Sequence, residues 1–87
     1  MELQEIRERI YGFLAQLKPA DGLTYDTELF KSKYITSLFA LQIVMFLEKE
    51  FSIKLGRKDI TEQNFHTINA MAELVQLRLG AGGGNNG

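Results

Sequence analysis

The chain has 87 residues, 45% of them apolar, and a net charge of −1. This length suits one small domain, and this composition predicts a packed core rather than a disordered chain. With no cysteine and a single histidine, His66, the sequence excludes a disulfide framework and argues against a zinc site.

Two further classes of protein are not expected. Acids and bases are interspersed along the chain instead of forming the basic stripe of a nucleic-acid-binding protein. No apolar run reaches the roughly 20 residues that a membrane-spanning helix needs, and residues 1–5 do not resemble the start of a secretory signal. We therefore expect a protein of the cytoplasm that binds neither nucleic acid nor a membrane.

Residues 2–17 predict an amphipathic helix, because apolar side chains recur at steps of three and four. These side chains are Leu3, Ile6, Ile10, Phe13, Leu14 and Leu17. On the other side, Glu5 and Arg9 are one turn apart and are placed to form an ion pair. Pro19 should end the helix, since the residue before a proline avoids helical dihedral angles.

Residues 18–36 form a connection that is long for a compact domain. We expect its apolar residues Leu23, Leu29 and Phe30 to anchor it to the core. Lys31 and Lys33 make the end of this connection basic.

Residues 37–51 form the clearest helical segment, because they contain neither Gly nor Pro and are apolar at helical spacing. The face expected to lie inside comprises Leu41, Val44, Leu47 and Phe51. The opposite side comprises Phe39, Gln42, Phe46 and Lys49. For the two phenylalanines of the second set, burial and exposure to a partner both remain open.

Two more helices are expected in the last third of the chain. A short one covers residues 59–64, where Asp59 is the expected N-cap and Glu62 completes a capping box. The last helix covers residues 68–79, with Thr67 as its N-cap and Gly80 as its stop signal. The inner face of this helix comprises Ile68, Met71, Ala72, Val75 and Leu79.

The predicted fold is therefore all-α, a small irregular bundle of three main helices and one short helix. Residues 1–79 make up the domain. Residues 80–87 are rich in Gly and Asn, a composition that predicts a disordered tail.

Several motifs carry a resemblance to a known family. The central segment opens with Thr36-Ser37-Leu38 and ends with Leu47-Glu48-Lys49-Glu50-Phe51. Flanking it are Asp26-x-x-Leu29-Phe30 upstream and Asn64-Phe65-His66-Thr67-Ile68 downstream. The pattern resembles the acyl carrier proteins, whose second helix opens on Asp-Ser-Leu and ends on Leu-Glu-x-Glu-Phe. The resemblance covers residues 3–79.

The resemblance implies that Ser37 bears a covalent 4′-phosphopantetheine arm, whose thiol holds acyl intermediates as thioesters. Its implied partners are a phosphopantetheinyl transferase and enzymes that activate or transfer acyl groups. A carrier of this kind is a monomer and not an enzyme. The residues agree, since a phosphodiester at a helix start meets free N–H groups and the positive end of the helix dipole. Read without the resemblance, Ser37 is a helix-capping hydroxyl.

The sequence also departs from the family. Thr36 replaces the usual Asp, which in the family is thought to help the transferase place a metal ion, and Tyr34 replaces a common Gly. The hydroxyl of Thr36 is still expected to cap the helix, without the charge of an Asp. The second helix lacks the usual acidic patch, so its expected partner-binding residues form a more apolar surface. They are Phe39, Gln42, Met45, Phe46 and Lys49.

These departures indicate a specialised carrier that serves a dedicated set of partners. They also keep an alternative open, namely a carrier-fold interaction module that is never modified. Fatty acid, polyketide, peptide and other pathways remain open, as does the choice between an acyl and an aminoacyl cargo.

Overall fold

The computed structural model describes residues 1–17, 21–32 and 35–85, and the side chains of these residues except Ser37 and residues 81–85. It contains α1 (Leu3–Leu17), α2 (Ser37–Phe51), the short α3 (Glu62–Phe65) and α4 (Ile68–Asn85). The described parts of the chain hold no strand. The predicted all-α bundle of three main helices and one short helix is therefore confirmed.

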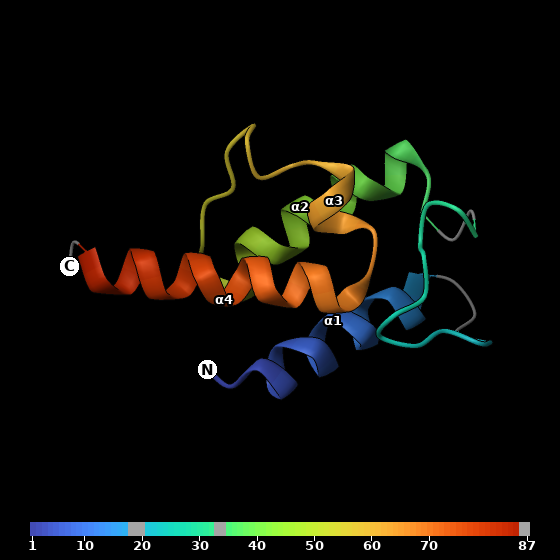
Figure 1. Ribbon diagram of the computed structural model, residues 1–87, viewed down its shortest axis with the longest axis horizontal. Helices are drawn as coiled ribbons and strands as arrows, with labels where there is room; N and C mark the ends of the chain where they lie inside the picture. The colour runs from blue at the N-terminus through green and yellow to red at the C-terminus, as the bar shows by residue number, and fades with distance from the viewer. Residues whose placement is uncertain (18–20, 33–34, 86–87) are drawn as a thin grey trace.

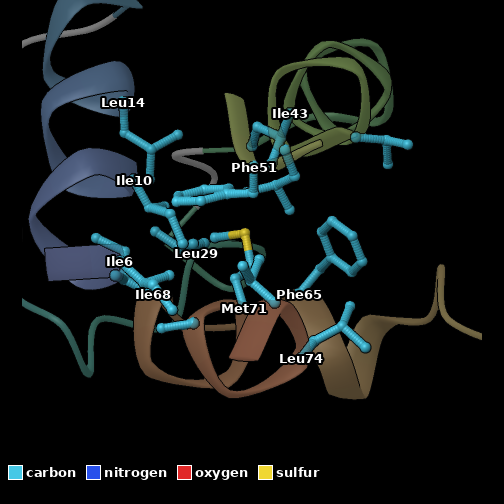
Figure 2. Close-up of a cluster of buried hydrophobic side chains, with 14 of the residues drawn as sticks. Ile6, Ile10, Leu14, Leu29, Ile43, Phe51, Phe65, Ile68, Met71 and Leu74 are labelled. Carbon is cyan, nitrogen blue, oxygen red and sulfur yellow. The ribbon is translucent and has the colours of Figure 1, made fainter. Parts of the chain in front are cut away.

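α4 is the element around which the others are arranged. It contacts each of the other three helices, and in Figure 1 it runs across the molecule with α1 below it and α2 and α3 above it. Figure 2 shows the core that results, in which the sulfur of Met71 lies among side chains from α1, α2 and the connection between them. One contiguous core therefore joins all four helices.

α1 has the predicted amphipathic form. Ile6, Ile10 and Leu14, each one turn from the next, are buried. On its outer side, Arg9 pairs with Glu5 at 2.8 Å, as predicted, and with Glu50 of α2 at 3.0 Å. The helix is thus joined to the rest of the molecule by apolar contacts on one side and by charge on the other.

The long connection between α1 and α2 is anchored to the core as expected. Leu23 and Leu29 are buried, and Phe30 is half-buried against the core. The backbone N–H of Leu29 donates to the carbonyl of His66 at 2.8 Å. Pro19, Lys33 and Tyr34, which also belong to this connection, lie outside the described residues.

α3 begins later than predicted, because its cap is a different residue. The Thr61 hydroxyl accepts a hydrogen bond from the Asn64 N–H at 3.2 Å and caps the helix. Asp59, the expected cap, is buried and accepts instead from the Gly56 N–H at 3.0 Å and from Arg78 of α4 at 2.7 Å. The arginine lies too far along the chain for a local motif to reveal this use of the carboxylate.

α4 begins where predicted and ends later. The Thr67 hydroxyl accepts from the Ala70 N–H at 3.0 Å, which confirms it as the N-cap. The helix continues past the expected end at residue 79 to Asn85. Gly80 lies within the helix and does not end it. Its φ is not in the left-handed region that a helix-terminating glycine adopts. The division of the chain into a domain and a tail at residue 79 stays a prediction, and residues 86–87 lie outside the described part.

The predicted inner face of α2 is wrong at one position. Val44, Leu47 and Phe51 are buried as expected, but Leu41 is 59% exposed and Ile43 is completely buried in its place. Because α2 is apolar on most sides, its sequence pattern does not determine how the helix is rotated about its axis. Packing against the core decides the rotation.

Candidate functional site

The start of α2 is built by the cap that the sequence predicts. Thr36 has an extended backbone (φ −100°, ψ 173°), and its hydroxyl accepts a hydrogen bond from the Phe39 N–H at 3.4 Å. Its carbonyl accepts the first helical hydrogen bond, from the Ala40 N–H at 2.9 Å. Ser37 is therefore the first residue of the helix, although its side chain lies outside the described part of the structure.

The backbone reaches this position directly from the core. Ile35 is buried, and its N–H donates to the carbonyl of Leu29 at 3.1 Å. On either side of Ser37, Thr36 is exposed and Leu38 is 67% exposed. The helix start is thus anchored to the core by Ile35 and faces solvent at both neighbours of the serine.

The five predicted partner-binding residues divide into two groups. Gln42, Met45 and Lys49 are exposed, as a contact surface requires. Phe39 and Phe46 are half-buried and pack against the core. The sequence left open whether these two side chains are buried, and the structure shows that both are buried in part.

The ring of Phe46 has specific partners. It stacks on Phe13 of α1 with the ring centroids 4.1 Å apart and the planes 7° from parallel. It also meets Phe51 edge-on at 6.2 Å. Such ring pairs are worth about 0.5–1.5 kcal/mol beyond area burial, so Phe46 contributes to packing α2 against α1.

Sequence reasoning missed two exposed residues of α2. Leu38 and Leu41 lie on the same side of the helix as Met45, which is 64% exposed. The spacing of three and then four residues aligns them in one row, here called the apolar stripe. The available signal was the excess of apolar residues in α2 over what one buried face needs.

Four of the predicted partner-binding residues also line one groove. Gln42, Met45, Phe46 and Lys49 lie along a groove of about 820 Å³ between α1 and α2. The remaining lining residues are Phe13, Leu17, Glu48, Ile53 and Lys54. This α1–α2 groove and the apolar stripe share Met45, so they form one continuous surface.

The described residues contain no other arrangement that points to chemistry of their own. They include no group of three or more His, Asp or Glu side chains that could hold a metal ion. His66, the single histidine, contacts Glu28 at 3.2 Å through its Nδ1 and so joins the connection to the end of α3. Within the described parts, no helix has the length and apolar character needed to cross a membrane.

Comparison with known proteins yields one informative match. The chain is 36% identical over 56 residues to a probable acyl carrier protein, PigG, from a Serratia species. The match spans 64% of this chain and 64% of that protein. No protein-family model matches the chain, and no solved structure matches it. The resemblance to the acyl carrier proteins that the sequence motifs indicate is confirmed by this relative, and the small helical bundle agrees with it.

Proposed function

We propose that the protein is an acyl carrier whose Ser37 holds a 4′-phosphopantetheine arm. The arm carries acyl groups as thioesters and presents them to the enzymes of a specialised pathway in the cytoplasm. One observation supports this most directly: α2 begins at Ser37, behind the Thr36 cap, in a chain that is similar to a probable acyl carrier protein.

The position suits a phosphodiester for a physical reason. The first N–H groups of a helix have no partner within the helix, and the helix dipole makes this end positive. A phosphate attached to the first residue therefore meets hydrogen-bond donors and a favourable field. The Phe39 N–H donates to the Thr36 hydroxyl, and the Ala40 N–H donates to the Thr36 carbonyl. The backbone N–H groups of α2 that precede Phe39 are therefore the ones suited to the phosphate.

In this role the protein catalyses no reaction itself. Its chain holds the arm, and the partner enzymes make and break the bonds of the cargo. Tethering the cargo raises its effective concentration at a partner's active site once the carrier is docked. The surface beside Ser37 therefore matters as much as the serine.

We place the docking surface on the exposed side of α2. Leu38, Leu41 and Met45 supply apolar area within about two turns of Ser37. Gln42 and Lys49 flank this stripe, and both are exposed. Partners should therefore present an apolar patch to this carrier rather than a strongly basic one.

Intact-mass measurement tests the proposal. The purified protein is incubated with coenzyme A and a promiscuous phosphopantetheinyl transferase, and it should gain the mass of one 4′-phosphopantetheine. Ser37→Ala should gain none, while Ser32→Ala and Ser52→Ala should gain as much as the unaltered chain. No gain by the unaltered chain, or a gain by Ser37→Ala, would refute the proposal. The first of these results would favour the unmodified interaction module.

Thr36 offers a second test of the same proposal. Thr36→Asp keeps a capping side chain and restores the residue that is usual in the family. Modification of Thr36→Asp by the transferase should be faster than that of the unaltered chain. Thr36→Asn, which caps without the charge, is the control and should show no such acceleration.

A further inference from the structure

The α1–α2 groove has the features of a docking site for a segment of a partner enzyme. We infer that it binds an acidic amphipathic helix of such a partner, with the apolar side chains of that helix in the groove and its carboxylates beside Lys49 and Lys54. This inference rests on the proposed carrier function, because the groove lies beside the attachment point of the arm.

The floor of the groove is apolar and already ordered. The stacked rings of Phe13 and Phe46 lie at the junction of α1 and α2. Leu17, Met45 and Ile53 complete the apolar lining. Because the rings are held by each other, a partner's side chains would enter a preformed surface, which lowers the cost of binding.

The rim of the groove carries positive charge. Lys49 and Lys54 are both exposed, and neither forms an ion pair with any residue that the structure describes. The one acid in the lining, Glu48, is half-buried, and its carboxylate accepts a hydrogen bond from the Leu55 N–H at 2.9 Å. Glu48 keeps its negative charge but directs its carboxylate to a backbone donor, so the two lysines supply the exposed positive charge of the groove.

The neighbouring charges behave differently. Arg9 and Glu50, which join α1 to α2, are paired with each other at 3.0 Å. Among the described residues, no acid pairs with the two groove lysines, so in this inference the partner supplies it. Charge complementarity of this kind favours carboxylates and disfavours a basic segment.

An amphipathic helix fits both features at once. Its apolar residues, spaced by three and four, would contact the floor, and its acidic residues at the boundary would meet the lysines. The groove is open to solvent rather than enclosed, which suits a segment lying in it better than an enclosed small molecule.

The groove also leaves the arm free. With a rise of about 1.5 Å per residue, Gln42 lies about 8 Å and Lys49 about 18 Å along the axis of α2 from Ser37. A helix bound in the groove would therefore lie beside the helix start without covering it. The partner could hold the carrier there while the arm reaches its active site.

Chemical-shift mapping with designed peptides tests the inference. Two amphipathic peptides share one apolar face of leucines and differ in their polar face, which is Glu in one and Lys in the other. Each is titrated into the isotope-labelled, unmodified protein. The Glu peptide should perturb the backbone amides of Phe13, Met45, Lys49, Ile53 and Lys54, and it should bind about tenfold more tightly than the Lys peptide.

Charge reversal sharpens the test. The double variant Lys49→Glu/Lys54→Glu should reverse the preference between the two peptides. Lys58→Glu makes the same kind of charge change at an exposed lysine outside the groove lining, and it should leave the preference unchanged. Unaltered dispersion of the amide spectrum shows that each variant is folded.

Other occupants would overturn the inference and are recognisable. Equal binding of the two peptides would contradict the role of the lysines. Shifts confined to other parts of the surface would contradict the choice of the groove. Shifts of the groove amides on raising the protein concentration alone would assign the groove to a second copy of the chain. Dodecanoate perturbing these amides while the Glu peptide does not would assign it to a small amphiphile.

The peptide titrations use the unmodified protein, so their outcomes are distinguishable from those of the modification test. A failure of peptide binding together with modification of Ser37 would refute only the docking site. Peptide binding without modification would refute only the carrier role of Ser37.

Discussion

α1 and α2 have the same length, 15 residues, but they treat their outer sides in opposite ways. α1 buries Ile6, Ile10 and Leu14 and presents charged residues, such as the Glu5–Arg9 pair, to solvent. α2 buries its own inner row and in addition exposes the apolar stripe of Leu38, Leu41 and Met45. The core uses one face of each helix, so folding does not explain the stripe.

The difference indicates which surface has a purpose beyond folding. Single exposed apolar residues are common on proteins and need no explanation. A row of three on one helix, continuous with an apolar groove and adjacent to Ser37, is characteristic of an interaction site. The outer side of α1 is occupied by its own ion pairs, and the outer side of α2 is the surface that we propose binds partners.

The inner faces of the two helices should be equally important for stability. Ile10→Ala in α1 and Leu47→Ala in α2 each remove a completely buried side chain. Each should lower the free energy of unfolding by about 2–5 kcal/mol, through lost burial and the cavity left behind. Urea denaturation measures both. A cost below about 1 kcal/mol for Leu47→Ala would show that α2 is not packed as described.

The polar side of α1 should contribute next. Arg7 donates to the Asn69 side-chain oxygen at 2.6 Å, and the Asn69 amide nitrogen donates to Asp26 at 2.6 Å. Asn69→Ala removes both bonds and should cost about 1–3 kcal/mol in the free energy of unfolding. Gln76→Ala changes an exposed position on α4, the helix that contains Asn69. It is the control, and its free energy of unfolding should stay within about 0.5 kcal/mol of that of the unaltered chain.

The cap of α2 should contribute less. Thr36→Ala loses the hydroxyl that accepts from the Phe39 N–H at 3.4 Å. The expected cost is about 1 kcal/mol, measured by the same denaturation. Thr36→Ser keeps the hydroxyl and should remain near the unaltered stability. Equal losses in the two variants would mean that the methyl group, not the cap, matters.

The apolar stripe should contribute least to stability and most to recognition. Leu41→Ser should change the free energy of unfolding by less than about 0.5 kcal/mol, because the side chain is 59% exposed. It should nevertheless slow modification by the transferase, as a loss in kcat/KM. Leu77→Ser, at a residue of α4 that is 62% exposed, is the matched control. If both variants are modified at the unaltered rate, the stripe does not bind the transferase.

Local features of this protein were predictable from its sequence. The bounds of α2, the Thr36 cap and the Thr67 cap agree with the predictions. Each depends on hydrogen bonds between residues at most four positions apart, together with the spacing of apolar residues. For the same reason, the sequence alone placed Ser37 at the first position of the central helix.

Only the tertiary structure decided the features that depend on residues far apart in the chain. Ile43 is buried in the core where the sequence predicted Leu41, because of how α2 is rotated against its neighbours. The pairing of Asp59 with Arg78 and the stacking of Phe46 on Phe13 join separate elements. A pattern within one helix records which residues are apolar, but packing between helices determines which of them are buried and which line the α1–α2 groove.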